Sequence, residues 1–342
     1  MHEPKTYKGV SRPLLAGLVA LIAIVGALIT YKAGGAMTAI AKVEAGGGLS
    51  SKALWYEGAA GGNATVVHTV NYVGWVAIAL AYGLLLGAAI KTVLPRAWLA
   101  RSLEGPRGQV LGGLFGAPLM LCSCCATPVF EAVYKRTGRL GPSLAMLLAP
   151  PGLNPGALVL TFLLFPAPLG LARLVLSVLL VVASTACVAH FFPGTQSTTS
   201  SLLEEEAQSW TGLLRAFAKA FFEVTLHSLP AILLGIVLSA WLITSTPIPE
   251  FAASLSGFPL LIMVGLVATL IAIPTFAEIP IGLALLQAGA PNGVVLTVLV
   301  AAPLVNLPSL LGLAKLASPK VALATGAMVF LACTGAGMVF GF

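Results

Sequence analysis

The sequence predicts an all-α integral membrane protein, built as an inverted repeat with broken or re-entrant helix hairpins and about nine membrane segments. Three observations support this fold class. First, 58% of the 342 residues are hydrophobic and only 8% are charged, whereas soluble domains carry about 25% charged residues. Second, the chain contains 37 glycines and 23 prolines, as expected for membrane helices that pack closely and are interrupted in places. Third, the two halves of the chain share a pattern of matched Pro, Gly and Asn residues.

The first apolar segment runs from Leu14 to Thr30, after the basic residues Lys5, Lys8 and Arg12. A basic start followed by an apolar run also fits a cleaved signal peptide, but we predict an uncleaved first helix. Further apolar segments are long enough to enter a membrane. They lie near residues 69–90, 110–133, 140–165, 168–192, 221–244, 258–287, 291–315 and 320–341.

We predict four regions along the chain. Residues 1–68 form the N-terminal helix and an extracytoplasmic loop, and residues 69–192 form a first transmembrane repeat. Residues 193–220 form a cytoplasmic linker, and residues 221–342 form a second transmembrane repeat. The linker begins with PGTQSTTSSLLEEE, which is rich in Ser and Thr and then acidic. That composition is typical of connecting segments.

The repeat is visible when residues 128–160 are compared with residues 280–312, a shift of 152 positions. Nine of the 33 positions are identical without a gap. Matches of Leu and Ala are expected by chance in so apolar a chain, but Pro, Gly and Asn matched in one register are more informative. The pairs are Pro128/Pro280, Gly141/Gly293, Pro151/Pro303 and Asn154/Asn306, and Gly83/Gly235 keeps the same spacing. Internal repeats of this kind are common in secondary transporters.

The distribution of Lys and Arg predicts that the second repeat is inverted relative to the first. Cytoplasmic loops are enriched in these residues, which places the basic N-terminus in the cytoplasm. Lys135, Arg136 and Arg139 then remain cytoplasmic only if the preceding segment enters and leaves the membrane on that side. In the second repeat the basic residues, Lys315 and Lys320, lie at a different junction. The alternative is a parallel duplication with four spans in each repeat.

Three cysteines lie within four positions, at Cys122, Cys124 and Cys125, inside an apolar run. Thiolates are soft ligands that suit soft species such as Cu(I), and by the same logic trivalent arsenic or mercury. We therefore predict that these thiols bind the substrate or a metal ion. Cys122 and Cys125 also have the spacing of a redox pair. Cys187 and Cys333 stand alone in apolar runs and are better explained as small buried residues.

The cysteine segment and its surroundings resemble the YraQ/ArsP-type predicted permeases. The resemblance rests on PLMLCSCCATPVF and LAMLLAPPGLNPGALVL in the first half, and on IPTFAEIPIGLALLQAGAPNGVVLTVLVAAPLVNLPSL in the second. It implies a membrane permease; some members of the family export trivalent organoarsenicals, and others are linked to transition-metal efflux. This chain adds Cys125 to the family's Cys-Ser-Cys segment, and its second hairpin has TFAEIP in place of cysteine.

Polar residues of the second hairpin and of the Pro/Asn segments extend the predicted substrate site. Glu278 is the sole acid of its hairpin, and an ionisable group inside a membrane costs about 2.5–3.5 kcal/mol on insertion scales. We predict that Glu278 couples transport to protons or cations; an acid that reaches the outer surface is the alternative. Asn154 and Asn306 either satisfy backbone groups freed by neighbouring prolines or line the substrate path. Thr275 is a weaker candidate.

Four prolines mark the places where we predict that the hairpin helices are broken, because proline removes a backbone hydrogen bond and clashes with the preceding turn. They are Pro128, Pro151, Pro280 and Pro303. Two other charged residues, Glu131 and Arg173, also lie in or beside apolar segments. A position at the membrane–water interface is one explanation for each of them.

The sequence favours a secondary transporter and not an enzyme, since it contains no Walker A motif for ATP hydrolysis and no legible Ser/His/Asp arrangement. We predict a multi-pass permease of the inner (plasma) membrane that exports a soft thiophilic solute, such as a trivalent arsenical or a soft metal ion. The alternative is a membrane thiol oxidoreductase that uses Cys122 and Cys125. No cofactor is expected. The expected partners are the solute or metal ion and the lipid bilayer, without nucleic acid, and a homo-oligomer is compatible with the sequence.

Overall fold

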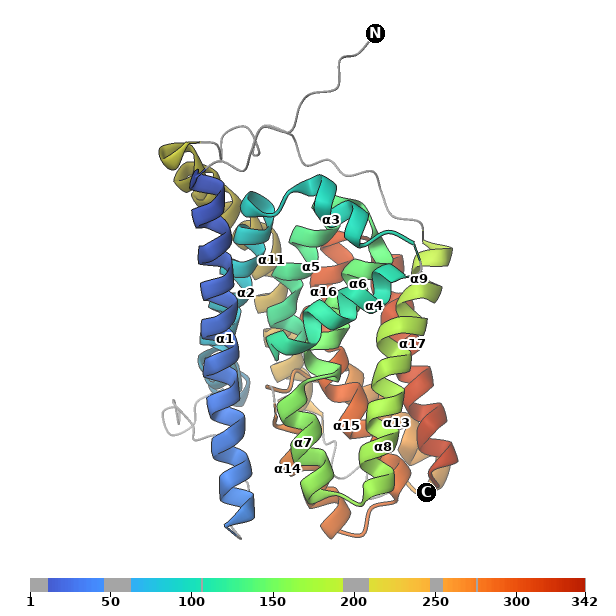
Figure 1. Cartoon of the computed structure of the whole chain (residues 1–342). Helices are drawn as coiled ribbons and strands as arrows, with labels where there is room; N and C mark the ends of the chain where they lie inside the picture. The colour runs from blue at the N-terminus through green and yellow to red at the C-terminus, as the bar shows by residue number, and fades with distance from the viewer. Residues whose placement is uncertain are drawn as a thin grey trace.

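The structure is a computed structural model that describes residues 12–45, 63–105, 107–192, 209–246, 255–274 and 276–341. Over these residues the chain forms helices joined by short connections, and none of them forms a strand. The helices stand together in one bundle (Figure 1). Most of the predicted extracytoplasmic loop and of the predicted linker lies outside the described residues.

Five helices among the described residues are long and apolar enough to cross a membrane. Two bent helix pairs also qualify if each pair counts as one span, which gives seven. This agrees with an all-helical integral membrane protein, while the total of nine membrane segments stays a prediction. The five are α1 (Arg12–Glu44), α2 (Ala64–Val93), the continuous helix α8 (Ala167–Leu179), η2 (Leu180–Ser184) and α9 (Thr185–Phe191), α11 (Trp210–Ser245) and α17 (Pro319–Val339).

Helix α1 lies along one side of the bundle (Figure 1). It is longer than the predicted segment, because the Ala-rich stretch from Tyr31 to Glu44 continues the helix, and alanine is the strongest helix former. Only four of its 33 residues are buried. Most of its apolar surface is therefore available to lipid.

Two helix pairs bend by similar angles, 41° and 42°, at a short break. The first pair is α6 (Leu140–Gly152) with α7 (Pro155–Leu164), and the second is α15 (Asn292–Leu304) with α16 (Leu307–Leu316). The first helix of each pair ends one residue after Pro151 or Pro303. The second helix begins with a proline in its first two positions, where the missing N–H costs no helix hydrogen bond. Proline therefore both ends one helix and starts the next.

Each half also contains two shorter helices joined by a non-helical tip. The first hairpin consists of α4 (Arg107–Gly116), the 3-10 turn η1 (Ala117–Leu119) and α5 (Ser123–Thr137), and the second of α13 (Gly257–Leu270) and α14 (Glu278–Gln287). Met120 and Phe276, in the two tips, are the non-glycine residues with positive φ in the described part of the chain, at 49° and 74°. Such backbone is uncommon and clusters at functional sites.

The predicted breaks at Pro128 and Pro280 do not occur at these residues. Pro128 is the sixth residue of α5 and Pro280 the third of α14, and both helices continue through them. The third position belongs to the first turn, where the backbone N–H has no partner within the helix. At Pro128 the helix gives up one hydrogen bond, to the carbonyl of Cys124. The interruptions lie before both prolines; their described residues are 120–122 in the first hairpin and 271–274 and 276–277 in the second.

The helices of the two halves follow the same order and pack in similar ways. Helix α4 packs on α6 as α13 packs on α15, and α7 packs on α8 as α16 packs on α17. The leading helices α2 and α11 run antiparallel. Thr65 at the start of α2 is hydrogen-bonded to Thr244 near the end of α11 at 2.7 Å, and Lys91 near the end of α2 pairs with Glu223 of α11 at 2.7 Å. Figure 1 shows α4 and α5 in the upper half of the bundle and α13 and α14 in the lower half.

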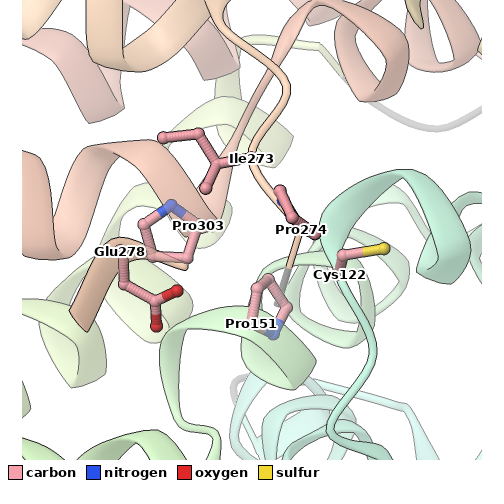
Figure 2. Close-up of a pocket in the computed structure, with 6 residues that line it drawn as sticks. All are labelled: Cys122, Pro151, Ile273, Pro274, Glu278 and Pro303. Carbon is pink, nitrogen blue, oxygen red and sulfur yellow. The ribbon is translucent and has the colours of Figure 1, made fainter. Parts of the chain in front are cut away.

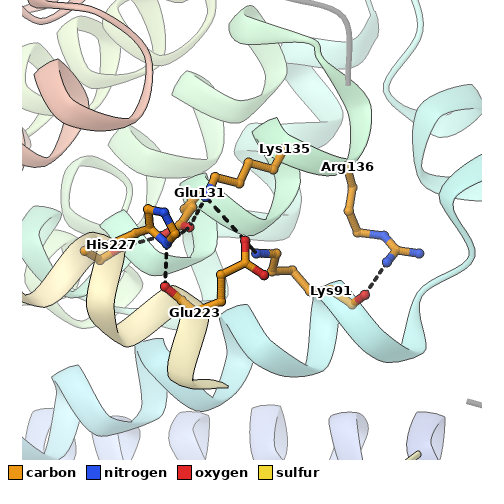
Figure 3. A network of polar contacts seen from close by, with 7 residues as sticks. Lys91, Glu131, Lys135, Arg136, Glu223 and His227 are labelled. Atoms are coloured by element: carbon orange, nitrogen blue, oxygen red, sulfur yellow. Dashed lines mark hydrogen bonds and ion pairs between the residues drawn. The ribbon is translucent and has the colours of Figure 1, made fainter. Parts of the chain in front are cut away.

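Charged side chains tie α2, α5 and α11 together at one end of the bundle (Figure 3). Lys135 of α5 pairs with Glu131 at 2.7 Å and with Glu223 at 3.5 Å. Lys91 contacts the same Glu223 carboxylate at 2.7 Å. Arg136 donates to the backbone carbonyl of Lys91 and so holds the end of α5 against the end of α2.

Candidate functional site

A cavity lies where the four interruptions of the helices meet (Figure 2). It is lined by Cys122 from the first hairpin tip, Ile273, Pro274 and Glu278 from the second, and Pro151 and Pro303 from the two bent pairs. The cavity volume is about 10 Å³, which is about the space of one water molecule. In this conformation the cavity therefore accommodates a single small ion, and a larger solute requires the hairpin tips and helix breaks to separate.

The three predicted thiols form one cluster beside this cavity. The Sγ atoms of Cys122 and Cys124 are 3.2 Å apart and those of Cys124 and Cys125 are 3.8 Å apart. All three sulfurs lie within 4.8 Å of one another, and all three cysteines are buried and free. Thiolates at this spacing can bind one soft ion together. Cys122 is the member that lines the cavity, and Figure 2 shows its sulfur directed away from the other labelled residues.

The geometry of the cluster does not single out a redox pair. The shortest sulfur distance joins Cys122 and Cys124, whereas the Cys-x-x-Cys spacing joins Cys122 and Cys125. The Tyr72 hydroxyl of α2 lies 3.8 Å from the sulfur of Cys124 and is buried with it. No sequence signal pointed to Tyr72, because it precedes Cys124 by 52 residues along the chain.

Close glycine contacts hold the start of α5 against α2. A Cβ atom at Gly83 would lie 2.1 Å from the carbonyl oxygen of Cys125, and one at Gly87 would lie 2.8 Å from the carbonyl oxygen of Pro128. Small residues four positions apart allow helices to approach this closely. The Gly83–Gly87 spacing is therefore a sequence signal for the close packing of α2 on the segment that carries the thiols.

Glu278 is buried and forms an ion pair with Arg173 of α8. Nη2 of Arg173 lies 2.9 Å from Oε1 of Glu278, and the two side chains are 1% and 2% exposed. Nη1 of Arg173 also donates to the hydroxyl of Thr161 on α7 at 2.8 Å. So buried a carboxylate does not reach the surface, which removes the alternative considered for Glu278. Arg173 is likewise buried in the interior of the protein.

Asn154 and Asn306 cap the helices that follow the two breaks. Oδ1 of Asn154 accepts from the backbone N–H of Gly156 at 3.0 Å, and Oδ1 of Asn306 accepts from that of Ser309 at 3.1 Å. Both side chains are 1% exposed, and neither Nδ2 group has a hydrogen-bond partner among the described residues. Both asparagines thus satisfy backbone groups beside the breaks, which is one of the two predicted roles. A contact with substrate stays a prediction. Thr275 lies outside the described residues.

A second group of potential ligands lies toward the other end of α5. Glu131, Glu223 and His227 each place one ligand atom within 4.8 Å of the others. Lys135 and Lys91 contact these two carboxylates at 2.7 Å, so their charge is already balanced. This group is an ion-pair network that joins helices. The spacing of Glu131 and Lys135, four residues apart, is a typical helix ion pair.

The structure brings part of the predicted site to one place. Cys122, Glu278, Pro151 and Pro303 line the cavity, and Cys124 and Cys125 adjoin Cys122. Sequence reasoning missed Arg173, which is 105 residues from Glu278 along the chain. It also missed Ile273 and Pro274, which lie in the tip of the second hairpin.

Comparison with known proteins identifies the family. The family ArsP_1, described as a predicted permease, matches residues 63–342. The UPF0718 protein YraQ of Escherichia coli (strain K12) is 32% identical over 260 residues, which cover 75% of this chain and 74% of that protein. No solved structure matches the chain. The chain therefore belongs to the ArsP_1 family of predicted permeases.

Proposed function

We propose that this permease exports a soft thiophilic solute, such as a trivalent arsenical or a soft metal ion, through the cavity between the hairpin tips and the helix breaks. One observation carries the proposal: residues of all four interruptions line a single cavity, and three buried thiols adjoin it. Secondary transporters bind substrates where discontinuous helices meet near the membrane midplane. Thiols select soft species over hard cations, which gives the site its chemical preference.

The architecture in this proposal is an inverted repeat. The antiparallel α2 and α11 support it, since the leading helices of inverted repeats cross the membrane in opposite directions. The positions of the two hairpins in opposite halves of the bundle support it too (Figure 1). A parallel duplication would place both hairpins in the same half.

In this proposal the permease lies in the inner membrane, and its N-terminus faces the cytoplasm. Lys135 contacts Glu223 of α11 at 3.5 Å, and Lys315 donates to the carbonyl of Leu226 of the same helix at 3.4 Å. Basic residues of both repeats therefore gather at one end of the bundle. This clustering supports a cytoplasmic location for this end, since cytoplasmic loops are enriched in Lys and Arg.

Accessibility labelling tests this orientation. Single cysteines introduced at Lys135 and Lys315, in a background without the native cysteines, should both react with a membrane-impermeant maleimide from the cytoplasmic side only. A cysteine at Lys42, near the far end of α1, serves as the matched control and should react only from outside. A probe at position 135 that reacts only from outside contradicts the re-entrant first hairpin.

Glu278 is our candidate for coupling transport to protons or cations. It is the acidic residue that lines the cavity, and release of a thiolate-bound metal requires protons to replace the metal. Glu278 is paired with Arg173 in the structure. Binding of a proton or cation to this carboxylate therefore requires either that the ion pair breaks or that the carboxylate contacts Arg173 and the incoming ion together.

A sensitivity panel tests the proposed function. Cells with and without the permease are compared for growth in trivalent arsenicals, Cd²⁺, Cu⁺ and the hard cation Mg²⁺, followed by uptake into inside-out vesicles of any solute that distinguishes them. We expect resistance to at least one soft species and no effect of Mg²⁺. Equal growth in every soft species would reject the proposed substrate class.

A further inference from the structure

The ion pair of Arg173 and Glu278 is isolated in an otherwise uncharged region. Arg173 is the one charged residue on α7 and α8, and Glu278 is the one charged residue on α13 and α14. Burial of either charge alone is costly. Each residue therefore requires the other for the fold, but this requirement alone does not explain why Glu278 lines the cavity.

The two carboxylate oxygens of Glu278 differ in their contacts. Oε1 accepts from Arg173 at 2.9 Å, while Oε2 makes no hydrogen bond with any described residue. Figure 2 shows the carboxylate beside Pro151 and Pro303, which belong to the two helix breaks. One oxygen is thus engaged, and the other is available to a hydrogen-bond donor or cation that enters the cavity.

Arg173 is itself held in place by the first repeat. Its Nη1 donates to Thr161 at 2.8 Å, and the Thr161 hydroxyl donates in turn to the carbonyl of Ala157 at 2.7 Å. Ala157 lies in the first turn of α7, directly after the break that contains Asn154. The planar guanidinium can serve Thr161 and Glu278 at the same time, which a lysine ammonium on a flexible stem does less well.

We propose that Arg173 is a positioning residue of the transport site: it holds the Glu278 carboxylate at the cavity wall with one oxygen free for the solute or coupling ion. The pair also joins the two halves of the chain across the site, because Arg173 is on α8 and Glu278 is on α14. This inference rests on the proposed function. It goes further in naming the group that fixes the carboxylate and the oxygen that remains free.

The test separates this role from a purely structural ion pair. The experiment compares two quantities between variants: the uptake of phenylarsine oxide into inside-out vesicles across a range of pH, and the melting temperature of the purified proteins. Arg173→Gln and Glu278→Gln each leave one buried charge unpaired and should lower the melting temperature. The double variant Arg173→Gln with Glu278→Gln leaves neither charge, so its melting temperature should return toward that of the parent. Its uptake should remain about 10- to 100-fold slower than that of the parent, as for a misplaced reacting group, and the shape of its pH profile should differ from that of the parent.

Two further variants keep the inference testable if the neutral pair does not fold. The reversed pair, Arg173→Glu with Glu278→Arg, keeps one carboxylate and one guanidinium but moves the carboxylate to α8; it should fold and lose uptake. Arg173→Lys keeps the charge and should slow uptake, because one ammonium cannot bridge Thr161 and Glu278 in the same geometry. The matched control is the exposed pair Arg139 and Glu104, whose double Gln variant should behave as the parent.

Uptake equal to that of the parent in the neutral pair, the reversed pair or Arg173→Lys overturns the inference. Such a result leaves the proposed function intact, since the parent still transports. If parent vesicles take up phenylarsine oxide no faster than vesicles without the permease, the proposed function fails for this arsenical instead. The two failures are therefore distinguishable in one experiment.

Discussion

Replacement of Cys122, Cys124 and Cys125 together by serine is expected to abolish transport of the soft solute while the protein remains folded. Serine is close to cysteine in size, so the packing of α5 changes little, but a hydroxyl is a hard ligand with low affinity for soft ions. Mutation of residues that only hydrogen-bond to metal ligands already costs about 10–100-fold in metal affinity. Loss of all three sulfur ligands should therefore slow uptake by more than about 100-fold. Vesicle uptake and the melting temperature measure the two effects.

The matched control replaces the two other cysteines, Cys187 and Cys333, by serine and alanine. Both lie outside the thiol cluster, and this variant should transport as the parent does. Single variants then separate ligation from redox chemistry. A redox mechanism requires both Cys122 and Cys125, so substrate binding that survives loss of either one would disfavour the oxidoreductase alternative. Unchanged transport by the triple variant would remove the thiols from the mechanism.

Gly83→Ala is expected to destabilise the protein strongly and to expose the thiols. The new Cβ would lie 2.1 Å from the carbonyl oxygen of Cys125, well inside contact distance, so α2 and α5 must separate. Overpacking typically costs about 1–3 kcal/mol, and here the displaced backbone also carries the thiols. We expect a lower melting temperature and faster alkylation of Cys124 and Cys125.

Gly34→Ala is the matched control for this change. Gly34 lies within α1, and a Cβ there meets no atom within 4 Å. The same substitution should be neutral or slightly stabilising, since alanine is favoured over glycine in a helix by about 0.8–1.0 kcal/mol. If both alanine variants melt at the temperature of the parent, α2 and α5 are not packed as closely as the structure indicates.

Local sequence predicted those features that depend on neighbouring residues. The apolar segments gave the helical membrane class, and Pro151 with Asn154 marked a break that lies where the proline ends one helix and the asparagine caps the next. The thiol cluster followed from three cysteines within four consecutive positions. Pro128 was misleading, because a helix tolerates the loss of one hydrogen bond when its tight packing on α2 is retained.

Features that depend on distant residues could not be predicted. The partner of Glu278 is 105 residues away, and no spacing rule connects a lone arginine on one apolar helix with a lone glutamate on another. The length of α1 was underestimated for a local reason instead: the apolar segment ends before the helix does, and the Ala-rich residues that follow continue it. In both cases tertiary packing or helix propensity decides the outcome, and the hydrophobic pattern carries no information about it.

Protection of the thiols by the solute tests the central claim most directly. In the background that lacks Cys187 and Cys333, the permease is treated with N-ethylmaleimide during turnover, with and without phenylarsine oxide, and modification of Cys122, Cys124 and Cys125 is followed by mass spectrometry. If the solute binds at the thiols beside the cavity, it should slow the alkylation of all three. Identical alkylation rates with and without the arsenical, in vesicles that still transport it, would contradict the account.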